Sequence, residues 1–72
     1  MMPTRLNRLI SDLEIYHAAN LVIEQFGEEA EIAATSMIDW MRDYGDVEGR
    51  IVWMRVRSAI MALQAPPGDA KH

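Results

Sequence analysis

The sequence contains no cysteine, and this absence removes several classes of protein at once. A disulfide-linked scaffold, a thiolate zinc site and thiol catalysis all require cysteine. A chain of 72 residues therefore depends on packing or on association for its stability. Because so small a domain buries only about 60% of the surface that its unfolded chain exposes, we expect support from an oligomer or a protein partner.

Long apolar runs and an excess of positive charge are missing as well. No uncharged apolar stretch approaches the roughly 18 residues of a transmembrane helix. The first ten residues carry Arg5 and Arg8 without the apolar core of a signal peptide, so we expect a cytoplasmic protein with no membrane association. Eleven acidic residues against seven basic ones give a net charge of −4, which disfavours binding of nucleic acid through its phosphates.

Helical signals recur along the chain, whereas no segment alternates apolar and polar residues as a half-buried strand does. Ser11 and Glu14 form an S-x-x-E capping box, which marks a helix start. A stripe with helical spacing then continues to Gly27, a residue suited to ending a helix, and predicts a first helix over residues 12–26. The stripe consists of Ile15, Ala19, Val22, Ile23 and Phe26.

Two further helices follow. Acidic residues after Gly27 suit the positive end of a helix dipole and predict a second helix over residues 28–44. Gly45 and Asp46 then supply a helix end and an N-cap, and the sequence APPG ends a third helix predicted over residues 47–64. The apolar stripe of the second helix consists of Ala30, Ala33, Ala34, Met37, Trp40, Met41 and Tyr44.

These elements predict an all-α fold, a compact three-helix domain with very short corners between its helices. Residues 1–11 are expected to form an N-terminal arm or a short extra helical turn. Residues 65–72 are expected to form a frayed C-terminal tail, because two prolines and a glycine follow the last helix.

Three segments carry a resemblance to a known family: AANLVIEQFGEEA at 18–30, YGDVEGRIVW at 44–53 and IMALQ at 60–64. Together they resemble a family of short uncharacterised alphaproteobacterial helical proteins, a domain of unknown function. The resemblance covers residues 12–64 and implies a bacterial origin and a compact helical fold, but no catalytic residue. The chain departs from the family pattern at Met54 and Met61, where polar residues are usual.

The segment GDVEG superficially resembles a phosphate-binding loop. Such a loop needs a lysine and a hydroxyl as well as glycines, and here Asp46 and Glu48 would repel a phosphate. We therefore interpret the segment as a capped corner between two helices, in which Gly49 keeps the third helix close to its neighbour.

Metal and catalytic sites have little support. His17, Asn20 and Glu24 share one face of the first helix, but a closed metal site needs three or four ligands, so a solvated polar face is the preferred interpretation and metal binding an alternative. Ser36 and Ser58 have no histidine near them in sequence. We expect a non-enzymatic protein without catalytic residues, metal or cofactor.

The third helix carries apolar residues on two opposite faces. One is the expected core face, with Gly49, Val52, Trp53, Val56, Ala59, Ile60 and Leu63. The other, here named the second apolar strip, consists of Val47, Ile51, Met54, Ser58 and Met61. It is bordered by Arg50 and Arg57 on one side and by Glu48 and Arg55 on the other.

An exposed apolar strip with a charged border is typical of an interface, and methionine and arginine are both frequent there. We predict a protein-protein interaction module that forms a homodimer, or binds another protein, through this strip. One alternative is that the N-terminal arm covers the strip with Leu6, Leu9 and Ile10. Another is a small regulator of nucleic-acid transactions, in which the last two helices act as a helix-turn-helix pair and Arg50, Arg55 and Arg57 contact phosphates.

Overall fold

The computed structural model describes residues 11–65, and the fold in this range is all-α, as predicted. It consists of α2 (Asp12–Phe26), the short 3₁₀ turn η1 (Gly27–Glu29), α3 (Ala30–Asp43) and α4 (Val47–Gln64). No strand occurs within residues 11–65. The predicted arm, apart from Ser11, and the predicted tail, apart from Ala65, lie outside the described residues.

The bounds of α2 and α4 coincide with the predicted helices, whereas α3 is shorter at both ends than the second helix predicted over about residues 28–44. Gly27 adopts a φ of +58° and turns the chain, so Glu28 and Glu29 lie in the 3₁₀ turn before α-helical spacing begins at Ala30. At the other end Tyr44 is the C-cap of α3 rather than a helical residue.

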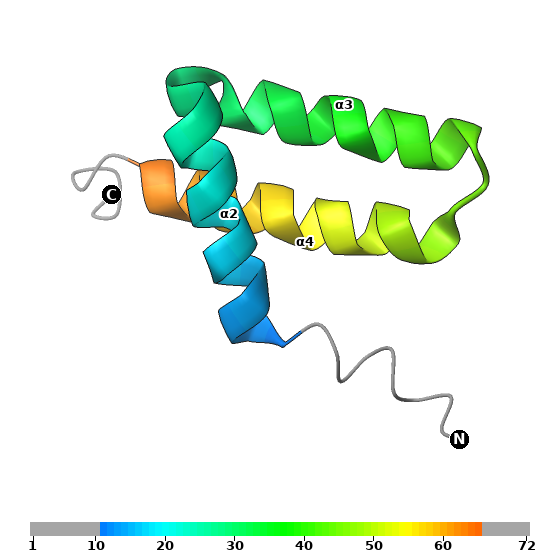
Figure 1. Cartoon of the computed structure of the whole chain (residues 1–72), viewed down its shortest axis with the longest axis horizontal. Helices are drawn as coiled ribbons and strands as arrows, with labels where there is room; N and C mark the ends of the chain where they lie inside the picture. The colour runs from blue at the N-terminus through cyan, green and yellow to red at the C-terminus, as the bar shows by residue number, and fades with distance from the viewer. Residues whose placement is uncertain (1–10, 66–72) are drawn as a thin grey trace, which may run out of the picture.

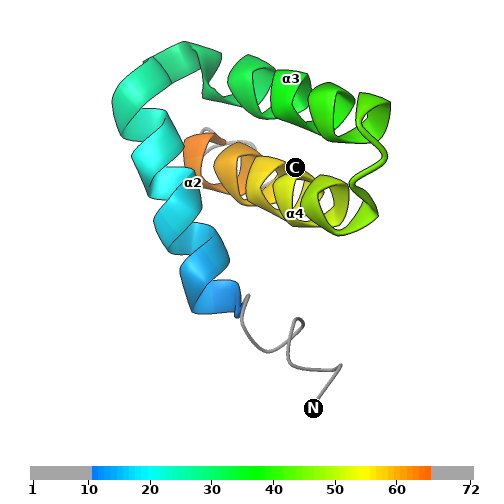
Figure 2. The same cartoon turned by 45° about the vertical axis from the view of Figure 1, so that its right-hand side comes forward.

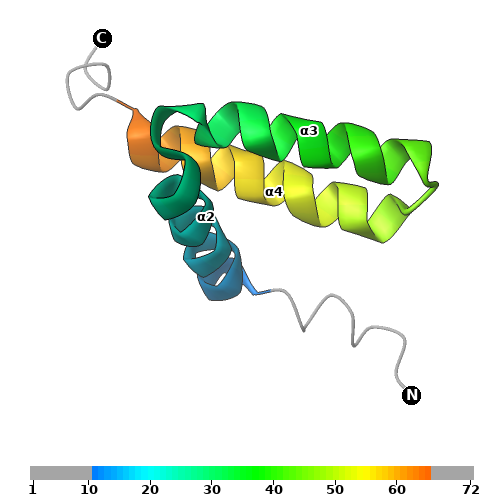
Figure 3. The ribbon, with the colours of Figure 1, turned by 45° about the horizontal axis from the view of Figure 1, so that its top comes forward.

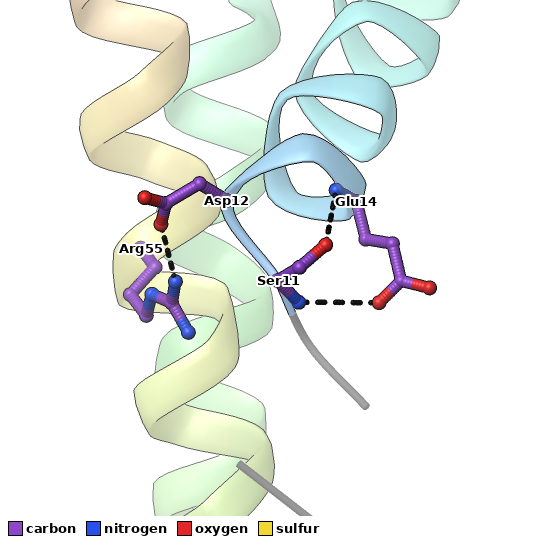
Figure 4. A network of polar contacts seen from close by, with 4 residues as sticks. All are labelled: Ser11, Asp12, Glu14 and Arg55. Atoms are coloured by element: carbon purple, nitrogen blue, oxygen red, sulfur yellow. Dashed lines mark hydrogen bonds and ion pairs between the residues drawn. The ribbon is translucent and has the colours of Figure 1, made fainter. Parts of the chain in front are cut away.

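The first turn of α2 forms the predicted capping box (Figure 4). The backbone N–H of Glu14 donates to Ser11 Oγ, and the backbone N–H of Ser11 donates to Glu14 Oε1, both at 3.2 Å. These bonds satisfy backbone donors that the start of a helix otherwise leaves unpaired.

Replacing Ser11 with alanine should therefore lower the free energy of unfolding by about 1 kcal/mol, because the bond to the Glu14 N–H is lost. Urea denaturation followed by circular dichroism measures this loss. Ser36→Ala is the matched control, since Ser36 is exposed in the middle of α3 and caps nothing. Equal stability of the two variants would show that this cap does not determine where α2 starts.

The segment GDVEG is a corner, as the sequence predicts. Gly45 has a φ of +74°, a conformation that side chains rarely adopt, and the N–H of Asp46 donates to Met41 O at 2.8 Å. Asp46 Oδ1 then accepts the N–H of Gly49 at 2.8 Å, so a carboxylate occupies the start of α4 where a phosphate would otherwise bind. A Cβ on Gly49 would lie 2.8 Å from Met41 Sδ, which shows how closely α3 and α4 approach at this corner.

The three helices form a hairpin with a crossing helix. Helices α3 and α4 lie side by side and antiparallel, and α2 crosses α4 near the end opposite the corner (Figures 1 and 3). Turning the molecule shows that the corner end of the hairpin extends beyond α2 (Figure 2). The core lies where all three helices meet, and its buried residues are Ile15, Ala19, Ala30, Ala34, Val56, Ala59 and Ile60.

Some predicted core positions are exposed. Trp40 and Tyr44, assigned to the core stripe of the second helix, are 53% and 72% exposed and pack against each other with ring centroids 5.6 Å apart. They belong to the C-terminal end of α3, at the corner end of the hairpin, and this end extends beyond α2 (Figure 2). Leu63, assigned to the core face of α4, is also exposed, whereas Trp53 is half-buried and packs against the core.

Candidate interaction surface

The second apolar strip is exposed, as its position opposite the core face requires. Its four large residues, Val47, Ile51, Met54 and Met61, are between 47% and 63% exposed, and Ser58 is exposed as well. Opposite them on α4, Val56, Ala59 and Ile60 are buried. The strip residues follow one another at alternating spacings of four and three, the pattern by which one helix packs along another.

The arginines beside the strip connect α4 to its two neighbours. On one side Arg57 pairs with Glu31 of α3 at 3.6 Å, and on the other Arg55 pairs with Asp12 of α2 at 2.8 Å (Figure 4). Arg50 is half-buried, and its Nε lies buried without a hydrogen-bond partner. The strip therefore lies between two charged borders, and each border includes an arginine bound to another helix.

A groove of about 420 Å³ extends the strip toward α2. Its floor on α4 includes Ile51, Met54 and Ser58, and its wall on α2 includes Ile15 and Tyr16. The sequence did not predict that Tyr16 lies at this surface. Which residues of α2 lie beside α4 depends on where the two helices cross, and the apolar periodicity of each helix does not determine the crossing point. The only local signal is an aromatic residue next to the predicted stripe of α2.

Apolar residues outside the predicted stripes differ in exposure. Leu13, Leu21 and Ile32 are exposed, whereas Ile38, which lies off the predicted stripe of the second helix, is half-buried. The exposed three are distributed over α2 and α3. The second apolar strip is therefore distinguished by its continuity along one helix and by the adjoining groove.

Of the residues considered for metal binding and catalysis, only Ser58 belongs to this surface. His17, Asn20 and Glu24 are exposed on α2, and residues 11–65 contain no group of three or more His, Asp or Glu side chains placed to hold a metal ion. Asp39 and Asp43 lie on the exposed surface of α3, where Arg42 contacts them at 3.6 and 3.8 Å. This arrangement is that of a solvated helix surface.

The geometry of the last two helices does not favour the helix-turn-helix alternative. In that motif the helices cross at about 90–120° so that the second can enter the major groove. Here α3 and α4 lie antiparallel along their lengths (Figure 1). Moreover, Arg55 and Arg57 each bind an acidic residue of a neighbouring helix.

Within the described part of the chain, no helix is both long enough and apolar enough to span a membrane. The alternative in which Leu6, Leu9 and Ile10 cover the strip falls outside the described residues. No protein-family model, no curated protein and no solved structure matches the chain, so the resemblance to the alphaproteobacterial family stays a prediction.

Proposed function

We propose that this protein is a non-enzymatic protein-protein interaction module that forms a homodimer through α4. The observation that supports the proposal is the second apolar strip. Its four large apolar residues are about half exposed or more, and they form one row between two charged borders. Surfaces of this composition are typical of the centre and rim of an interface.

The small core gives a second reason to expect association. Four of its seven buried residues are alanines, so the helices bury little apolar surface per residue. A domain of this size is marginally stable by itself, and a partner that binds only the folded state adds to its stability. Covering Ile51, Met54 and Met61 would bury apolar side chains without disturbing any contact of the core.

The molecular mass in solution tests this proposal. Sedimentation equilibrium from about 1 μM to about 1 mM covers dissociation constants that correspond to about 8 to 4 kcal/mol of binding free energy. We expect the mass to rise from monomer to dimer across this range, and the melting temperature to rise with it because association stabilises the folded chain.

A monomer mass at every concentration, with a constant melting temperature, would contradict self-association. The same measurement on a chain without residues 1–10 would then test the alternative in which the N-terminal arm covers the second apolar strip. If Leu6, Leu9 and Ile10 occupy the strip, their removal should cause association that the full chain lacks.

A further inference from the structure

We infer that two copies of α4 pair antiparallel, with Val47 opposite the partner's Ser58 and Ile51 opposite the partner's Met54. This inference rests on the proposed homodimer and specifies its geometry. The strip has the four-three spacing of a helix-helix seam over positions 47, 51, 54, 58 and 61. In an antiparallel pair this register places every strip residue from 47 to 58 opposite another strip residue.

Charges beside the strip favour this register. It places Glu48 beside the partner's Arg55, whose guanidinium also pairs with Asp12 of its own copy at 2.8 Å, and two-fold symmetry repeats the attraction on the other half of the dimer. It also places Arg50 beside the partner's Arg57, but Arg57 is already bridged to Glu31 at 3.6 Å, which offsets its charge. Opposite charges at such border positions determine orientation in paired helices.

The competing arrangements bring like charges together without that attraction. A parallel pair places Arg50 beside the partner's Arg55. An antiparallel pair shifted by seven residues places Arg55 beside the partner's Arg55, and Arg57 beside the partner's Arg57. Neither arrangement brings Glu48 to an arginine.

The position of α2 leads to the same orientation. Helix α2 crosses α4 near the C-terminal end of α4, so the first turns of α4 extend beyond α2 (Figures 1 and 2). An antiparallel pair seats the open first turns of each α4 in the groove of the other copy, against Tyr16 and Ser58. A parallel pair would instead place the first turns of the two α4 helices beside each other, outside both grooves.

Disulfide trapping tests the register directly, because the chain has no cysteine of its own. Two full-length variants, Val47→Cys and Ser58→Cys, are prepared separately, mixed in equal amounts at a concentration where the parent is dimeric, and equilibrated in a glutathione redox buffer. A disulfide needs Cβ atoms about 3.5–4.5 Å apart, and in this register positions 47 and 58 of opposite copies lie at the same level of the seam. Positions 47 and 47 would lie about 16 Å apart along the seam, at 1.5 Å per residue.

We expect the mixture to yield the 47–58 linked dimer as its dominant product by non-reducing mass spectrometry, and each variant alone to yield little. Ser36→Cys mixed with Ser58→Cys is the control for random collisions, since Ser36 is exposed on α3. Self-linking of Val47→Cys alone would overturn the inference in favour of a parallel pair.

A second mixture distinguishes this inference from the proposed function. Met54→Cys with Ser58→Cys links efficiently only in the register shifted by seven residues, so its dominance over the 47–58 product would overturn the inferred register. A dimer mass with no link above the control would also overturn the register while leaving the homodimer in place. A monomer mass for the parent protein would overturn both.

Discussion

Replacing Ile60 with alanine should remove a large share of the free energy that stabilises the folded protein. Ile60 is fully buried, is one of the two largest such side chains and belongs to the core cluster. Truncation of a buried isoleucine costs about 2–5 kcal/mol, because the transfer free energy is lost and a cavity remains. At about 0.05–0.15 kcal/mol per residue, a chain of 72 residues has a stability of about 4–11 kcal/mol, so this loss is a large fraction of the whole.

Circular dichroism at 222 nm, recorded against temperature and urea, measures this effect. Leu63→Ala is the matched control, because it removes the same number of carbon atoms from the same helix at a residue that is 45% exposed. That control should lose no more than about 1–2 kcal/mol. If both variants melted alike, the assignment of the core to Ile60 rather than Leu63 would be wrong.

Replacing Met54 with lysine should convert the proposed dimer to monomers. Met54 lies at the middle of the second apolar strip, where each copy would bring its charge into the interface. Lysine is a better probe than glutamate, because Arg50 and Arg57 lie four and three residues away on α4 and would neutralise a carboxylate. An unpaired charge in a dry interface costs several kcal/mol, so the dissociation constant should rise about 100-fold or more.

Sedimentation equilibrium gives the mass of this variant, and circular dichroism shows whether its helices remain. Ile32→Lys is the control, since Ile32 is an equally apolar residue that is 66% exposed on α3 and outside the strip. We expect the control to keep the parental mass. A helical Met54→Lys protein that still forms the parental dimer would place the interface elsewhere.

The helices could be predicted because their signals are local. The capping box of Ser11 and Glu14, the positive-φ Gly45 and the N-cap Asp46 each act within a few residues, and all three occur in the structure as expected. The second apolar strip could be predicted for the same reason, since the spacing within α4 alone places Met54 opposite the buried Val56.

The path of α2 could not be predicted, because a helix carries no local signal for its crossing point on another. This one unknown accounts for the main errors. Trp40 and Tyr44 share a face with the buried Ala30 and Ala34, yet they lie beyond α2 and stay exposed. The groove between Tyr16 and Ser58 exists only because of the same crossing.

The buried alanines have a consequence for how this protein can change during evolution. All three helices contribute to this set, which consists of Ala19, Ala30, Ala34 and Ala59. Because each of these side chains is a single methyl group, the helix backbones can pack closely together at these positions. A larger side chain at any of them forces the helices apart, at a cost of about 1–3 kcal/mol. Saturation mutagenesis should therefore show selection by volume at these positions, with glycine and serine tolerated far better than leucine. The residues of the second apolar strip are exposed, so this limit on volume does not apply to them. In the proposed homodimer, each strip residue from 47 to 58 should vary together with the strip residue that lies opposite it in the other copy.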